Sequence, residues 1–155
     1  MQKAYRILAH LIAGLVVLQA AFMVFAIAGL FKWIDDGATL DKGVIESWEE
    51  DPPTWTGAVG HFLHVMSGTF LIPLLGLVLL IIAFFAAVNG GVKWAGIVAV
   101  AIIVQVGAGI MSRTEGMPWL GFVHGLNAFI LFWAAIMAGR AAKQPSDMRE
   151  PAMVG

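Results

Sequence analysis

The sequence contains no cysteine and few charged residues. The absence of cysteine from all 155 residues excludes disulfide frameworks, thiolate catalysis and sulfur-ligated metal or iron–sulfur sites. Charged residues make up 12% of the chain, which is about half of the usual share, whereas 60% of the residues are hydrophobic. The formal net charge is −1 and no basic cluster is present, so the positive surface that nucleic-acid binding requires is missing. Because a small soluble domain leaves much of its surface in water, this composition predicts an integral membrane protein.

Four stretches are long and apolar enough to cross a membrane as helices. A helix needs about 20 mostly apolar residues to cross the hydrocarbon core, and the alternating pattern of membrane strands is absent. We therefore expect an all-α, single-domain four-helix bundle in the membrane. Because proline lacks a backbone donor, Pro73 predicts a kink near Thr69–Pro73 in the second span. The expected segments are spans at residues 4–31, 55–88, 92–112 and 118–142, an outer loop at 32–54 and a tail at 143–155.

The basic residues predict the orientation of the chain. By the positive-inside rule, the side with six of the nine lysines and arginines faces the cytoplasm. Both termini, the turn at 89–91 and the tail 143–155 are then cytoplasmic, in a multi-pass protein of the cell membrane. The outer loop 32–54 is acidic, and we interpret it as a solvated cap, with a binding site as the alternative. The six basic residues are Lys3, Arg6, Lys93, Arg140, Lys143 and Arg149, and the acidic residues of the loop are Asp35, Asp36, Asp41, Glu46, Glu49, Glu50 and Asp51.

The spans repeat in pairs. Residues 17–21 (VLQAA) and 103–107 (IVQVG) each place one glutamine in mid-span. Residues 62–68 (FLHVMSG) and 122–128 (FVHGLNA) share a phenylalanine, a branched aliphatic residue, a histidine and, four residues after the histidine, a small residue. The same order in both pairs predicts a two-helix pseudo-repeat with an approximate two-fold axis along the membrane normal.

The repeat relates His64 to His124. Both spans are expected to run from outside to inside, and each histidine lies about two turns below its helix start, so the two share one depth. Two neutral imidazoles that face each other across a bundle are a ligand set for a low-spin b-type heme. We therefore predict that His64 and His124 bind the iron of one heme b, for electron transfer near the outer face. In the alternative, each histidine is structural and bonds its neighbours. His10 is expected at the cytoplasmic interface.

Three further residues are candidate contacts of the cofactor. His61 precedes His64 by three residues on one helix face, so it bonds a heme propionate or substitutes as the axial ligand. Gln105 either bonds across helices or touches the edge of a cofactor or quinone. Arg113, at the outer end of the third span, pairs either with heme propionates or with Glu115.

These residues resemble one four-helix half of the heme A synthase family. Each half of that family carries a histidine on its second and fourth spans, and its third span often carries glutamine followed by glycine, as Gln105 and Gly107 do. The family's second-span motif reads Glu-x-x-His with glycine four residues later, which His64 and Gly68 match. His61 replaces the glutamate, and the arginine that commonly follows the histidine is absent. The resemblance covers about residues 4–142 and implies heme binding without heme A synthesis. Small four-span membrane proteins of unassigned function are similar too.

Two other classes of function stay open on the sequence. One is a non-enzymatic membrane subunit or small-solute carrier with structural histidines. The other is an outer-facing site for a divalent metal, made by His61, His64 and His124, since zinc takes three or four protein ligands. Under the heme hypothesis the partners are the lipid bilayer and a quinol or a redox protein at the outer face. No carboxylate lies within the spans, which argues against hydrolytic or proton-pumping chemistry.

Overall fold

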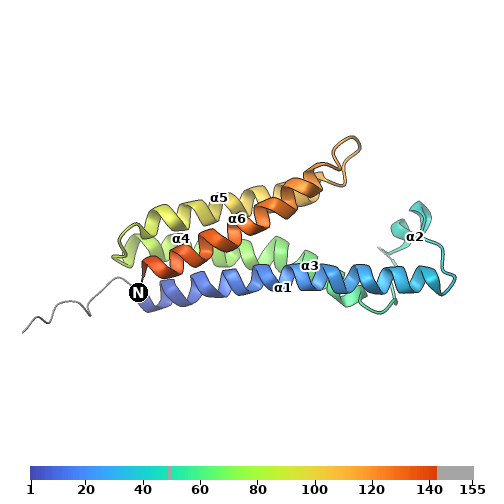
Figure 1. Ribbon diagram of the computed structural model, residues 1–155, viewed down its shortest axis with the longest axis horizontal. Helices are drawn as coiled ribbons and strands as arrows, with labels where there is room; N and C mark the ends of the chain where they lie inside the picture. The colour runs from blue at the N-terminus through green and yellow to red at the C-terminus, as the bar shows by residue number, and fades with distance from the viewer. Residues whose placement is uncertain (49, 143–155) are drawn as a thin grey trace, which may run out of the picture. The chain divides into compact units, whose positions relative to one another are not determined.

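The computed structural model describes residues 1–48 and 50–142, and all regular elements in that part of the chain are helical (Figure 1). Four continuous helical stretches are long and apolar enough to cross a membrane: Gln2–Asp35, Ala58–Phe85, Gly91–Met111 and Leu120–Ala141. The predicted all-α class with four such stretches is confirmed, whereas Glu49 and the tail 143–155 lie outside the described residues. The elements are α1 (Gln2–Asp35), α2 (Lys42–Ser47), α3 (Ala58–Met66), η1 (Ser67–Leu71), α4 (Ile72–Phe85), α5 (Gly91–Met111) and α6 (Leu120–Ala141).

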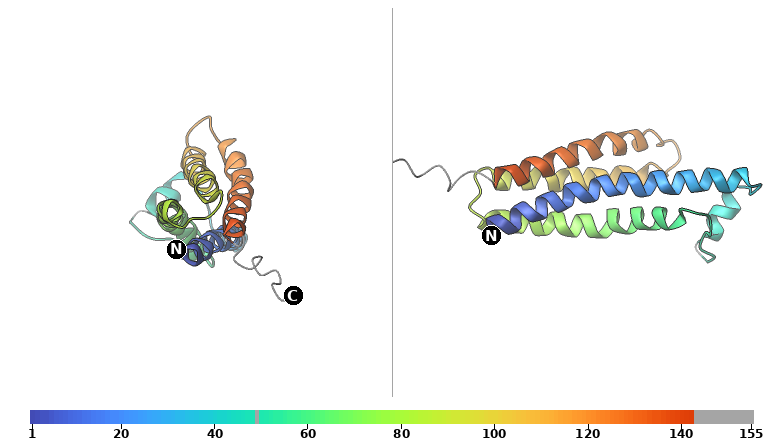
Figure 2. Two further views of the ribbon diagram at one scale, coloured as in Figure 1. Left: turned by 90° about the vertical axis from the view of Figure 1, so that its left-hand side faces the viewer. Right: turned by 60° about the horizontal axis from the view of Figure 1, so that its bottom comes forward.

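The chain divides into two compact units. The first consists of Met1–Gly14 and the chain from Pro73 onward, and the second consists of Leu15–Ile72. In the first unit, α5 and α6 lie side by side (Figure 2). In the second unit, the later part of α1 runs beside α3 (Figure 2).

Small and aliphatic side chains form the core of the first unit. The Tyr5 hydroxyl donates a hydrogen bond to the Gly91 carbonyl O at 2.8 Å, which ties the start of α1 to the start of α5. On α6, Ala134, Ala135 and Ala138 are buried, so a neighbouring helix approaches closely, as helix packing in lipid requires. The largest fully buried side chains are Tyr5, Ile12, Leu79, Val98 and Leu131.

Glycines bring α1 into backbone contact with α3 and the residues before it. A Cβ atom at Gly29 would overlap the carbonyl group of Thr56, and one at Gly60 would lie 2.5 Å from a carbonyl O of α1. Only glycine allows backbones to approach this closely, and such packing is common between helices in lipid. By contrast, a Cβ at Gly14 or Gly107 would meet no described neighbour within 4 Å, so these glycines are not part of such a contact.

The second span departs from α-helical geometry just before Pro73. Ser67–Leu71 forms a π-helical turn, in which the Ile72 N–H donates to the Ser67 carbonyl O five residues back. Proline has no N–H, and its ring crowds the carbonyl group four residues before it, here that of Thr69. A wider turn relieves this crowding. The sequence predicted a kink near Thr69–Pro73, and the structure has a π-helical turn at Ser67–Leu71.

The predicted outer loop 32–54 contains ordered helix at both of its ends. α1 continues past the predicted span end at residue 31 to Asp35, and the ion pair Lys32–Asp36 supports this extra turn. The short helix α2 starts at Asp41, whose carboxylate accepts the Val44 N–H at 2.9 Å. The ion pair and the cap lie on exposed side chains.

Trp33 and Trp48 both pack on Trp55 in the second unit. The ring centroids of Trp48 and Trp55 are 4.9 Å apart, and those of Trp33 and Trp55 are 6.3 Å apart. Trp55 is buried, and its Nε1–H donates to the Ala26 carbonyl O at 3.1 Å. A buried indole with its donor satisfied anchors the residues before α3 on α1.

Candidate functional site

The imidazole of His64 is held by the backbone of α1 in the second unit. Its Nδ1–H donates to the Gln19 carbonyl O at 3.1 Å, and the residue is half-buried. Because a carbonyl oxygen only accepts, this bond puts the proton on Nδ1 and the lone pair of the neutral ring on Nε2. Histidines that bind metals through Nε2 are commonly oriented by such a bond.

The imidazole of His124 is held in the same way in the first unit. Its Nδ1–H donates to the Gln105 carbonyl O at 2.8 Å, from α6 to α5. A Cβ atom at Gly109 would lie 2.9 Å from this Nδ1, so the glycine lets the ring rest against α5. In the neutral form of His124 the lone pair is therefore also on Nε2.

The side chains of both glutamines bond across helices as well. The Gln19 amide donates to Ser67 Oγ at 2.5 Å. In the first unit, Asn127 Nδ2 donates both to Gln105 Oε1 at 2.7 Å and to the Ala101 carbonyl O at 2.8 Å. We call His64, Gln19 and Ser67 the His64 cluster, and His124, Gln105, Asn127 and Ala101 the His124 cluster.

Sequence reasoning missed Ser67 and Asn127. Each is the polar residue three positions after a histidine, so it lies on the same helix face as that histidine. Both lie inside the repeated segments 62–68 and 122–128, and the shared polar position was the available signal. Only the structure identifies the glutamine on the neighbouring helix as the partner of each.

His61 and Gly68 lie on either side of His64 along the second span. His61 is half-buried and lies on α3, three residues before His64 on the same helix. A Cβ at Gly68 would lie 3.0 Å from Gln19 Oε1, so this glycine makes room for the glutamine side chain. Gln19 therefore occupies the space that Gly68 leaves one turn after His64.

His10 and Arg113 lie apart from both clusters along the chain. His10 Nδ1–H donates to the Arg6 carbonyl O at 2.7 Å within α1. A Cβ at Gly139 would overlap the His10 ring, so this glycine gives the imidazole its place against α6. Arg113 is exposed just beyond α5, and the described residues contain no ion pair between it and Glu115.

Metal-ligating side chains do not gather in threes. Within residues 1–48 and 50–142, no group of three or more histidines, cysteines, aspartates or glutamates could hold a metal ion. The outer divalent-metal site considered from the sequence thus finds no support in this part of the chain.

The comparisons with known proteins give no relative. No family model matches the chain, and neither a curated protein nor a solved structure matches it. The fold and the two clusters therefore define a class only: a helical chain with four helices long and apolar enough to cross a membrane, two of which carry a histidine bonded to a neighbouring backbone. The resemblance to heme A synthase rests on this sequence alone.

Proposed function

We propose that the protein binds one heme b through Nε2 of His64 and Nε2 of His124 and transfers single electrons. The observation that carries this proposal is the bond of each Nδ1–H to a backbone carbonyl group. A histidine used as an axial ligand needs its lone pair on one nitrogen and a fixed ring orientation, and the other nitrogen usually supplies both through such a bond.

The proposal includes the two-helix pseudo-repeat. In both clusters the histidine donates to the backbone of a mid-span glutamine, and the glutamine side chain bonds the polar residue three positions after the histidine. Contacts of one kind between matching positions support a common origin for the pairs of spans. The repeat relates the two proposed ligands, so each span pair contributes one.

The residues of the chain would bind, orient and insulate the group. A bound heme supplies one-electron redox chemistry at its iron. His64 and His124 contribute uncharged imidazoles, and the apolar spans keep the ligands in a medium of low dielectric. Arg113 offers a guanidinium to a propionate at the outer end of α5, while His61 and Gln105 offer polar contacts beside the ligands.

The proposed setting is the cell membrane. We place both termini in the cytoplasm because the basic residues gather on that side. The electron partner is a quinol or a redox protein at the outer face. Lipid surrounds the spans, as the exposed Phe122 and Phe129 of α6 support.

An optical spectrum of the purified full chain tests the proposal. After expression with ample heme, we expect a Soret band and the sharp visible bands of low-spin iron. His64→Ala and His124→Ala should each abolish the low-spin features, whereas His10→Ala, the matched control, should retain them because His10 bonds within its own helix. A colourless wild-type protein, or low-spin features in the double variant His64→Ala with His124→Ala, would overturn the proposal.

One alternative has a specific observation in its favour. Bonds from an imidazole to a backbone carbonyl group also stabilise helix packing without any cofactor. A non-enzymatic membrane subunit or small-solute carrier would use both histidines in this way. It predicts a colourless protein that tolerates His124→Ala and co-purifies with a larger complex or a solute.

A further inference from the structure

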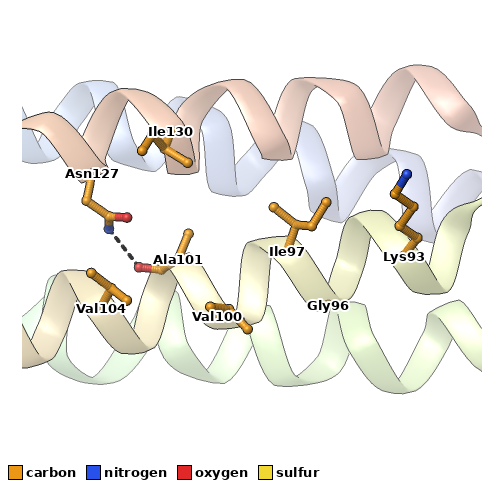
Figure 3. Close-up of a pocket in the computed structure, with 8 residues that line it drawn as sticks. All are labelled: Lys93, Gly96, Ile97, Val100, Ala101, Val104, Asn127 and Ile130. Atoms are coloured by element: carbon orange, nitrogen blue, oxygen red, sulfur yellow. Dashed lines mark hydrogen bonds between the residues drawn. The ribbon is translucent and has the colours of Figure 1, made fainter.

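An open groove runs along α5 and α6 in the first unit. Its volume is about 400 Å³, within the range of small-molecule sites. Lys93 stands at one end and Asn127 at the other, with apolar side chains between them (Figure 3). The residues that line it are Lys93, Gly96, Ile97, Val100, Ala101, Val104, Asn127 and Ile130.

Asn127 presents a hydrogen-bond acceptor to this groove. The residue is 7% exposed, and its amide N–H groups are used by the Ala101 carbonyl O and Gln105 Oε1. Because the Ala101 carbonyl group only accepts, Nδ2 must face it, and Oδ1 turns away from it along the groove (Figure 3). No described residue donates to Oδ1. No fully buried side-chain N or O of the described residues lacks a partner, so Oδ1 keeps some accessible surface.

The dimensions of the groove match one leaflet. Asn127 bonds the backbone at Ala101, eight residues along α5 from Lys93, so the two levels are about 12 Å apart at 1.5 Å per residue. Half of a hydrocarbon core is about 15 Å. With the Lys93 ammonium at the predicted cytoplasmic interface, Asn127 lies near the middle of the membrane, where water cannot satisfy Oδ1.

We propose that the groove binds the ring of a quinol, whose hydroxyl donates to Asn127 Oδ1. A ligand of this groove must be apolar and must enter from the membrane. It must also bring a hydrogen-bond donor to the middle of the membrane, where Asn127 Oδ1 lies. The acyl chain of a phospholipid has no donor, and its headgroup stays at the interface. A quinol ring has a hydroxyl and dissolves in the hydrocarbon, and its tail fits along Ile97 and Val100. Because Asn127 Oδ1 can only accept, a ring bonded to it must carry a donor, which favours the quinol over the quinone.

This inference rests on the proposed function only for the choice of a quinol as the electron donor, and it moves that donor from the outer face to the cytoplasmic half of the membrane. A ligand pair tests the groove directly: 2-naphthol, which carries one O–H donor, and 2-methoxynaphthalene, which has the same ring without it. Binding to the full chain in lipid nanodiscs is measured against empty nanodiscs, which corrects for partition into lipid. We expect 2-naphthol to bind saturably and about tenfold more tightly, the effect of one neutral hydrogen bond.

Two glycines of α5 supply a matched pair of variants. Gly96 lines the groove and Gly107 does not, and a Cβ at either position meets no described neighbour within 4 Å. Gly96→Phe fills the groove and should abolish saturable binding, whereas Gly107→Phe should retain it. Asn127→Leu should remove the preference for 2-naphthol.

The outcomes of this experiment distinguish a failure of the proposed quinol site from a failure of the heme proposal. Equal affinities for the two ligands, as for a groove that holds only acyl chains, would overturn the inference, and so would unchanged binding to Gly96→Phe. If Asn127→Leu fails to fold, the comparison of the two ligands on the wild-type protein still tests whether the groove prefers a ligand with a donor. A colourless protein that prefers 2-naphthol would refute the heme proposal and leave the site in the groove standing.

Discussion

The Nδ1–H of His124 donates to the backbone carbonyl O of Gln105 at 2.8 Å, so the orientation of this imidazole depends on the fold of α5. His64 has the corresponding bond to Gln19 at 3.1 Å. We expect ¹⁵N NMR of the histidine-labelled protein without heme to show the Nδ1–H tautomer at both positions.

A variant of the glutamine side chain serves as the control for this tautomer. Gln105→Ala keeps the backbone carbonyl group and should leave the His124 tautomer unchanged. An Nε2–H tautomer at His124 in the wild-type protein would contradict the bond.

The bond between the side chains of Gln105 and Asn127 should appear as a coupling free energy. We expect the double-mutant cycle of Gln105→Ala and Asn127→Ala, followed by unfolding in detergent micelles, to give about 0.6–1.7 kcal/mol, the range for polar pairs between membrane helices. The separate bond of Asn127 to Ala101 cancels in the cycle because it is lost in both backgrounds. A coupling of zero would mean that the side-chain bond contributes nothing to stability.

Two glycines of α1 should respond in opposite directions to the same substitution. At Gly29 a methyl group would overlap the Thr56 backbone, so Gly29→Ala should cost about 1–3 kcal/mol of unfolding free energy. At Gly14 nothing described lies within 4 Å, so Gly14→Ala should be neutral or stabilise by up to about 1 kcal/mol through helix propensity. Thermal unfolding of both variants in one detergent measures the difference. Equal effects would refute the backbone contact.

The proposed orientation can be tested on a background free of native thiols. The chain has no cysteine, so each introduced thiol reports on its own position. We expect Thr39→Cys, in the exposed outer loop, to react in intact cells with a membrane-impermeant maleimide. Asn89→Cys, exposed in the turn before α5, should react only after the cells are opened. Reaction of Asn89→Cys in intact cells would reverse the orientation.

The two clusters show which residues of the candidate site could be predicted from the sequence and which could not. The segments 62–68 and 122–128 singled out both histidines, because an imidazole in an apolar span is costly and therefore rare. The hydrogen-bond partners of these segments could not be predicted because they lie on other helices. Gln19 is 45 residues from His64 in the sequence, and Ala101 is 26 residues from Asn127. The ligation of one heme by both histidines stays a prediction.

The sequence by itself determined that the protein is helical and that four of its stretches can cross a membrane, because length and apolar content suffice to satisfy the backbone in lipid. It also predicted a kink near Thr69–Pro73, since proline lacks the N–H that an α-helix needs, and the structure has a π-helical turn just before Pro73. The tertiary structure decided which glycines allow helices to touch and which do not, as Gly29 and Gly14 illustrate. It also decided that Nδ1 of His64 and Nδ1 of His124 face backbone carbonyl groups of neighbouring helices. These features depend on the rotation and spacing of neighbouring helices, which many small packing contacts set together and no local pattern encodes.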